Sequence, residues 1–176
     1  MSDLHQPPHH AHRIRSDDPD EATSLVVSYD GHHSRVVHGT GRYGFEAAVL
    51  AGRQVRVGWA RTALGHTVGG SVRDACVQMS IDTGNRYAFG RRQMEVTPGR
   101  LTFISPGSGF TRRSKAGFMF AMDVDGAALA AEVRARRWDA TSEWARYPEV
   151  LDPPGQQKRA LGSAIADLVS ALDGQR

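Results

Sequence analysis

Apolar and polar residues alternate with a period of two along much of residues 45–124, which is typical of strands that bury one face. In one run, single charged or small residues separate Val55, Val57 and Trp59. The clearest runs are residues 55–60, 75–81, 101–104 and 118–124. Turn-forming pairs lie between the runs, and no stretch there has helical spacing. The pattern predicts a sandwich or barrel of antiparallel sheets with roughly seven or eight short strands.

Three other segments have the composition of helices. The first follows Asp18, a suitable N-cap, and has Pro19 at its first helical position. The second, residues 127–137, is rich in Ala and ends in Arg residues, which favour the negative end of a helix dipole. The third covers residues 156–172. The predicted fold class is therefore mainly β with C-terminal helices.

The last predicted helix carries a narrow apolar seam. Its members are spaced by four, three and four residues: Leu161, Ile165, Leu168 and Leu172. This spacing places them on one side of the helix. Such a seam could pack on the barrel of the same chain or on a second subunit, and the residues alone leave both alternatives open.

The chain length of 176 residues suits one domain with additional terminal segments. Residues 1–15 are rich in His and Pro with almost no apolar content, so we predict a flexible N-terminal arm. The barrel with its short leading helix is expected over residues 16–124. Residues 125–176 are expected to form the C-terminal helices.

Charge is distributed unevenly along the chain. The net charge is +3, but residues 31–137 are net basic, whereas the segments before and after them are net acidic. A basic middle segment indicates either an acidic ligand or neutralisation within the molecule, and the scattered basic residues favour the second. No secretory signal or membrane-spanning run is visible, and the lone Cys76 excludes an internal disulfide. We therefore expect a cytoplasmic protein that does not enter the membrane.

The common catalytic and cofactor motifs are missing from the sequence: there is no P-loop, H-E-x-x-H or G-x-S-x-G. A metal-binding barrel would need several His and acidic ligands. His66 has Val68 two residues later rather than a second His. We therefore propose no catalytic residue, no metal and no cofactor. His38 and His66 are expected in loops or at the barrel rim.

Five segments together resemble a known family. They are residues 17–22 (DDPDEA), 55–61, 76–81, 96–107 and 118–137. Their order and spacing resemble the N-terminal, cupin-type effector-binding and dimerisation domain of AraC/XylS-family transcription regulators, over roughly residues 14–140. The most specific segment, residues 96–107, resembles the family's second cupin motif without its metal-binding His.

The resemblance implies a cupin-like double-stranded β-barrel (jelly roll) followed by a helical dimerisation segment. It also implies a sensor of a small-molecule effector rather than an enzyme. It favours a homodimer formed through Leu161, Ile165, Leu168 and Leu172. DNA would be bound only through a helix-turn-helix domain that this chain does not contain, so the chain is expected to be a separated sensor domain or a naturally shortened regulator. The alternatives are a stand-alone cupin-fold enzyme acting on a small metabolite, and a dimerisation module with a filled barrel.

Five residues combine the apolar and polar properties of a ligand pocket: Trp59, Arg61, Gln78, Phe103 and Met122. Arg61 next to Trp59 on one strand suits a carboxylate or aromatic ligand, although an outward-facing, solvated Arg fits the sequence equally well. Both faces of the strands are partly apolar. Alternation therefore does not decide which face lines the pocket.

Overall fold

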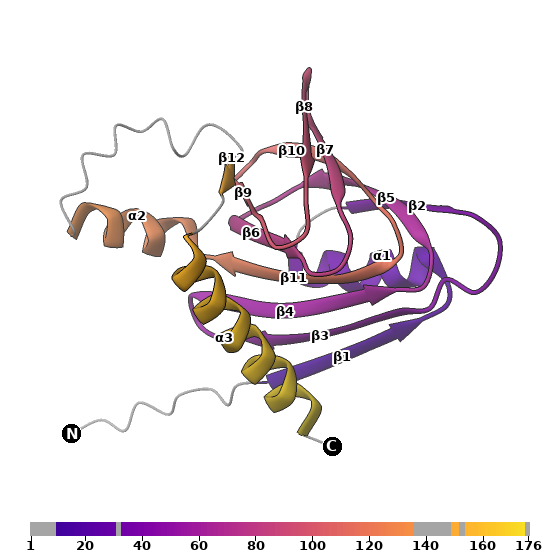
Figure 1. The fold of residues 1–176 in the computed structure, drawn as a ribbon, viewed down its shortest axis with the longest axis horizontal. Helices are drawn as coiled ribbons and strands as arrows, with labels where there is room; N and C mark the ends of the chain where they lie inside the picture. The colour runs from indigo at the N-terminus through magenta and orange to yellow at the C-terminus, as the bar shows by residue number, and fades with distance from the viewer. Residues whose placement is uncertain (1–9, 31–32, 136–148, 152–153, 175–176) are drawn as a thin grey trace.

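The computed structural model describes residues 10–30, 33–135, 149–151 and 154–174 (Figure 1). The strands are β1 (His10–Ser16), β2 (His33–His38), β3 (Phe45–Ala51), β4 (Val55–Thr62), β5 (Gly65–Ser71), β6 (Ala75–Ser80), β7 (Asn85–Phe89), β8 (Arg92–Val96), β9 (Leu101–Ile104), β10 (Gly109–Ser114), β11 (Gly117–Val124) and β12 (Glu149–Leu151). The helices are α1 (Pro19–Asp30), α2 (Gly126–Ala135) and α3 (Gly155–Gly174). The predicted fold class, mainly β with C-terminal helices, is confirmed.

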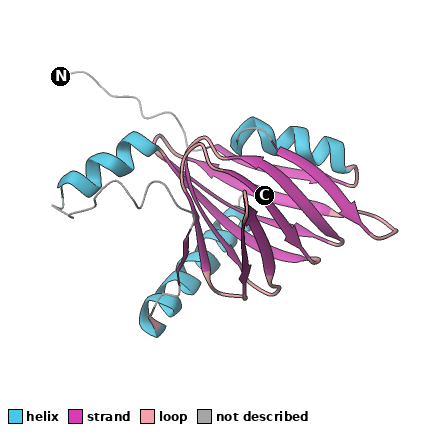
Figure 2. Cartoon of the chain, turned by 90° about the horizontal axis from the view of Figure 1, so that it is seen from above, coloured by secondary structure: helices cyan, strands magenta, loops and turns pink. Residues whose placement is uncertain are grey.

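The strands form two antiparallel sheets that face each other (Figure 2). The seven-stranded sheet has the order β1-β3-β4-β11-β6-β9-β12, and the five-stranded sheet has the order β2-β5-β10-β7-β8. Apolar side chains from both sheets meet between them: Val68 and Phe110 of the five-stranded sheet pack in one cluster with Cys76 and Ile104 of the seven-stranded sheet. The space between the sheets is therefore the interior of a double-stranded β-barrel.

The seven-stranded sheet is apolar on both faces. In β6, Cys76 belongs to the interior cluster, whereas Met79 packs on the opposite face with Phe120 and Ile165. Ile165 belongs to α3, which runs across the outer face of this sheet (Figure 1). The outer apolar residues of the strands are therefore covered by a helix of the same chain.

The packing of α3 on the sheet shows where two residues of the predicted dimer seam lie. Ile165 is buried against the sheet of its own chain, and Leu161 packs beside it. For these two residues the structure shows the alternative that the sequence left open, packing on the parent barrel. The side chains of Leu168 and Leu172 lie outside the described part of the chain. A dimer through this seam remains a prediction.

The segment before the barrel is more ordered than the sequence indicates. Residues 10–15, which were expected to belong to a flexible arm, lie in β1 and pair with β3. Ile14 anchors this edge strand because it is buried with Ala22 and Phe45. A strand with a single large apolar residue has little alternation to reveal it. Residues 1–9 of the predicted arm lie outside the described residues.

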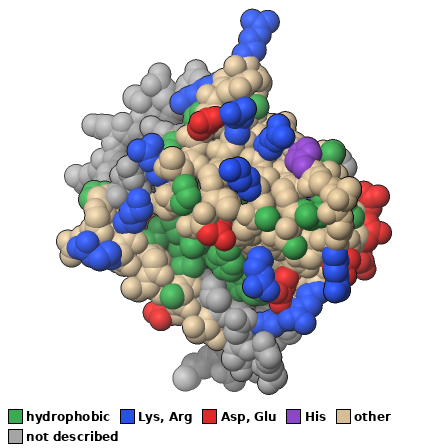
Figure 3. All heavy atoms as spheres, turned by 45° about the vertical axis from the view of Figure 1, so that its right-hand side comes forward, with side chains coloured by type: hydrophobic (Ala, Val, Ile, Leu, Met, Phe, Trp, Pro, Cys, Tyr) green, Lys and Arg blue, Asp and Glu red, His purple; other side chains and the backbone are tan. Residues whose placement is uncertain are grey.

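Helix α1 begins as the sequence predicts. The Asp18 carboxylate accepts hydrogen bonds from the backbone N–H of Asp20 at 2.8 Å and of Glu21 at 3.4 Å, which confirms the N-cap. Helix α2 extends away from the barrel (Figures 1 and 2). None of the helices in the described ranges is long and apolar enough to cross a membrane. Lys and Arg side chains are spread over the face shown in Figure 3, with acidic groups among them.

Candidate functional site

A cavity of about 100 Å³ lies between the two sheets. Its apolar wall includes Phe45, Ala47, Val68, Phe110 and Met119. Its polar wall includes His33, Arg35, His66, Gln78, Asn85 and Arg112. For scale, an apolar cavity of about 150 Å³ in another protein accommodates benzene. The combination of apolar walls and a few polar groups is typical of a site for a small ligand.

Arg112 places a positive charge inside this cavity. It lies on β10, and only 5% of its surface is exposed. Its Nη1 donates a hydrogen bond to Oε1 of Gln78 at 3.0 Å and also contacts the sulfur of Met119. Its Nη2 lies 3.4 Å from Nε2 of His66, and no described group accepts a hydrogen bond from its buried Nε. None of these described partners of Arg112 carries a negative charge.

No carboxylate in the described ranges forms an ion pair with Arg112. Asp123 is the one acidic residue among those that line the cavity, and it lies 3.5 Å from Arg56, which also pairs with Asp74 at 3.2 Å. A buried charge without an opposite charge nearby costs free energy, because it loses water without gaining an ion pair. The cavity therefore contains a positive charge that the described residues do not neutralise.

Gln78 fixes the position of the Arg112 guanidinium. Its Oε1 accepts one hydrogen bond from Arg112 and a second, at 2.9 Å, from the hydroxyl of Tyr87. Tyr87 is almost completely buried, and this burial raises the pKa of its hydroxyl, which stays protonated as a donor. A carbonyl oxygen held by two donors has little freedom to rotate. The amide of Gln78 therefore presents its oxygen to Arg112 in a defined orientation.

His66 is neutral in this environment. Burial, together with the positive charges of Arg112 and Arg35, lowers its pKa to about 3. Because Nη2 of Arg112 can only donate, the Nε2 of neutral His66 that faces it is the acceptor. A neutral imidazole adds no second positive charge to the centre of the cavity.

The expected place of His66 in a loop or at the rim was wrong, because it is 5% exposed and lies within β5 between β2 and β10. Three glycines of this strand, Gly65, Gly69 and Gly70, interrupt the alternation that would have revealed it.

His38 is exposed at the end of β2, where it forms a 2.7 Å hydrogen bond with Thr67. Within the described ranges, no three His, Cys, Asp or Glu side chains are grouped closely enough to hold a metal ion.

A second cation, Arg35 of β2, also lines the cavity. Its guanidinium lies over the ring of Phe45, 4.7 Å from the centroid, and donates a 2.9 Å hydrogen bond to the hydroxyl of Tyr43. Lys115 contributes a further positive charge to the lining. Positive charge therefore exceeds negative charge in this cavity.

Of the five residues predicted to bind a ligand, Trp59 and Gln78 line the cavity, whereas Arg61, Phe103 and Met122 do not. The ring of Trp59 also stacks on Phe118, with centroids 5.6 Å apart. Met122 packs in the outer cluster beneath α3. The selection failed because the outer face is as apolar as the inner face, so alternation did not distinguish them. A role in ligand binding for any of the five remains a prediction.

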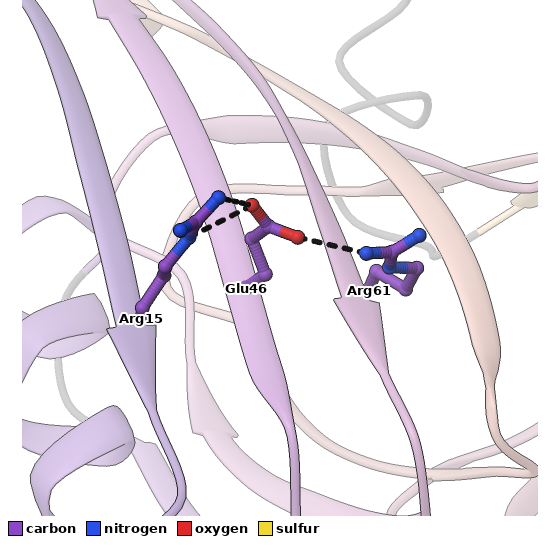
Figure 4. Close-up of polar contacts among 3 residues, drawn as sticks. All are labelled: Arg15, Glu46 and Arg61. Atoms are coloured by element: carbon purple, nitrogen blue, oxygen red, sulfur yellow. Dashed lines mark hydrogen bonds and ion pairs between the residues drawn. The ribbon is translucent and has the colours of Figure 1, made fainter.

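Arg61 takes part in a surface network instead (Figure 4). Its Nη2 lies 2.9 Å from one oxygen of Glu46, and the other oxygen accepts hydrogen bonds from Arg15 at 2.7 and 3.0 Å. Burial would raise the pKa of Glu46, but the hydrogen bonds and charges of the two Arg residues outweigh this effect and lower the pKa. The side chain of Arg61 is 64% exposed, which matches the solvated alternative weighed from the sequence.

Sequence reasoning missed Arg112, the most informative residue of the site. A weak signal was present, because Phe110 and Arg112 alternate with Thr111 and Arg113, and the pairing of β10 with β5 and β7 confirms a strand there. An Arg in phase with a buried Phe is a candidate for an inward-facing cation. The second Arg of the pair, Arg113, is exposed.

The structure is similar to that of a known regulator. The AraC-like transcriptional activator CuxR matches with a TM-score of 0.71 at 15% sequence identity, over 93% of this chain and 62% of CuxR. This chain thus spans less than two thirds of CuxR. At this identity the match shows a shared fold, and it confirms at that level the resemblance to the cupin-type domain of AraC-like regulators.

Two other solved structures match more weakly. An RmlC-like cupin from Shewanella frigidimarina has a TM-score of 0.42 at 13% identity, over 52% of this chain and 84% of the cupin. An oxalate decarboxylase from Bacillus subtilis has a TM-score of 0.41 at 16% identity, over 64% of this chain and 38% of the enzyme. No family model matches the sequence, and a search of curated protein sequences gave no match.

Proposed function

We propose that this chain is the effector-sensing domain of an AraC-type transcription regulator and that the cavity between its sheets is the effector site. The observation that carries the proposal is a cavity walled by both sheets, with apolar and polar groups, in a fold similar to that of an AraC-like activator. Binding in such a site would stabilise one arrangement of the domain over another and so alter the activity of the whole regulator.

The chemistry at the centre of the cavity supports sensing rather than catalysis. The guanidinium of Arg112 has N–H donors only and no acceptor atom. His66, with a pKa of about 3, is too weak a base to accept a proton from a substrate at that pH. Gln78 is occupied as an acceptor by Arg112 and Tyr87. These groups can hold a ligand in position but are poorly suited to proton transfer.

The partners of the whole protein follow from this proposal. A regulator of this kind would act in the cytoplasm and would bind DNA through a helix-turn-helix domain outside this chain. A homodimer is also part of the proposal. Because Leu161 and Ile165 contact their own sheet, other surfaces would contribute to the dimer interface.

Thermal-shift screening of the chain against small metabolites, followed by mass spectrometry of each compound that binds, tests the proposal. A ligand that binds only the folded state raises the melting temperature. We expect at least one compound to raise it and to be recovered unchanged. Turnover of the compound would instead support the cupin-enzyme alternative, and a screen without any binder would support a dimerisation module with a filled barrel.

A further inference from the structure

We propose that the cavity binds a small organic anion, a carboxylate with a short apolar group, through the Nε and Nη2 edge of Arg112. This inference rests on the proposed function and specifies the chemical class of the effector. Its basis is the arrangement of partners around a single buried guanidinium.

The two sides of the Arg112 guanidinium differ in their contacts. Nη1 is held by Gln78 and Met119. On the opposite edge, the buried Nε has no described acceptor, and Nη2 has only the long contact of 3.4 Å to the neutral His66. The guanidinium is therefore oriented from one side, while its other side presents two N–H donors that lack a strong acceptor.

The same edge of Arg binds carboxylates elsewhere in this chain. Arg15 donates from Nε at 3.0 Å and from Nη2 at 2.7 Å to Glu46, and Arg86 uses the same two atoms with Glu95. These exposed pairs show the geometry that a guanidinium edge adopts with a carboxylate. In the cavity, no carboxylate of the described residues takes this position next to Arg112.

The surroundings limit the ligand further. Arg35 and Lys115 add positive charge to the lining, and the one lining carboxylate, Asp123, is near Arg56. An anion would therefore gain favourable electrostatic energy, whereas a neutral ligand would leave Arg112 without a counter-charge. The volume of about 100 Å³ restricts the ligand to a small molecule. The apolar side chains of Val68 and Phe110 favour a carboxylate with an apolar group over a fully polar ion.

The test measures binding by calorimetry and thermal shift with a panel of probes: propionate, butyrate, benzoate, inorganic phosphate, the neutral isostere propionamide, and neutral sugars. We expect at least one carboxylate to bind and to raise the melting temperature, with its amide isostere ineffective. The Arg112→Met variant should lose this binding. Arg112→Lys, which keeps the charge but not the planar pair of donors, should weaken it about ten- to a hundredfold.

Arg113→Met is the matched control, because Arg113 is the exposed neighbour on the same strand, and this variant should bind the carboxylate as the unaltered chain does. If Arg112→Met does not fold, the comparison of Arg112→Lys with Arg113→Met decides. Equal affinity of the Arg112 variants and the unaltered chain would overturn the inference, as would equal binding of propionate and propionamide, or binding of phosphate alone. A sugar that binds while no anion does would overturn the inference but support the sensing function. If no compound of the panel binds, the result would count against both the carboxylate inference and the sensing function.

Discussion

Arg112 and Gln78 connect the two sheets of the barrel across the cavity, through a 3.0 Å hydrogen bond from Nη1 of the arginine on β10 to Oε1 of the glutamine on β6. The same oxygen accepts the hydroxyl proton of Tyr87 at 2.9 Å. Because Gln78 holds one edge of the guanidinium, the opposite edge has a defined position. A buried cation that is oriented but not neutralised is the feature that distinguishes this cavity from an ordinary barrel core.

Removing the side-chain oxygen of Gln78, which accepts both hydrogen bonds, should lower the stability of the protein. The Gln78→Leu variant leaves the buried donors of Tyr87 and Arg112 without their shared acceptor, which should lower the free energy of unfolding by about 1–3 kcal/mol. Urea denaturation measures this change. Gln93→Leu, at an exposed position of β8, is the control and should alter stability by less than about 0.5 kcal/mol. Unchanged stability of Gln78→Leu would contradict the assigned network.

The low pKa of His66 predicts a pH dependence of stability. Below pH 6.5 the unfolded chain takes up a proton on His66, whereas the folded chain does not until about pH 3. Stability therefore falls as the pH is lowered through this range, by at most about 1.4 kcal/mol per pH unit from this residue and by about 2 kcal/mol at pH 5. Denaturation of His66→Gln between pH 7 and 4 should show a shallower decline than that of the unaltered chain.

The exposed His38 provides the control for that experiment. His38→Gln leaves the buried His66 in place, so its stability should decline more steeply between pH 7 and 4 than that of His66→Gln. If His66→Gln and the unaltered chain lose stability equally between pH 7 and 4, the assignment of a neutral, buried His66 is wrong.

Arg61 should have no role in binding at the cavity. Its partner is Glu46 on the outer face, and exposed ion pairs contribute less than about 1 kcal/mol. Arg61→Ala should therefore leave the affinity for the best carboxylate probe unchanged and lower stability only slightly, as measured by calorimetry and urea denaturation. A tenfold loss of affinity would show that Arg61 takes part in ligand binding.

Helix α3 should contribute to the stability of the single chain. Ile165→Ala removes a buried side chain from the cluster with Met79 and Phe120 and should lower the free energy of unfolding by about 2–4 kcal/mol. Ser163→Ala, at an exposed position of the same helix, should have little effect. Sedimentation of both variants checks the alternative that the seam on this helix forms a dimer interface. If Ile165→Ala dissociates a dimer without loss of stability, the seam serves the second subunit.

The sequence predicted the elements with strong patterns and missed those without. Alternation identified the strands around Trp59 and Met79, and the Asp18 cap located α1, because these signals are local. Strand β5 is rich in glycine and β1 has one large apolar residue, so alternation did not predict either strand. The face of each strand could not be assigned, because α3 covers an outer face that is as apolar as the interior. Gln78 was selected, but Arg112 became recognisable only when pairing placed it inside.

Arg112 lies inside the barrel because it binds the ligand, and it lowers the stability of the ligand-free chain. The decisive experiment compares the melting temperatures of Arg112→Met and the unaltered chain in the absence of any ligand. Since the variant replaces an unneutralised buried charge by a shorter, apolar side chain, we expect a higher melting temperature, equivalent to about 1–3 kcal/mol of added stability. A melting temperature lowered by several degrees would show instead that Arg112 stabilises the barrel.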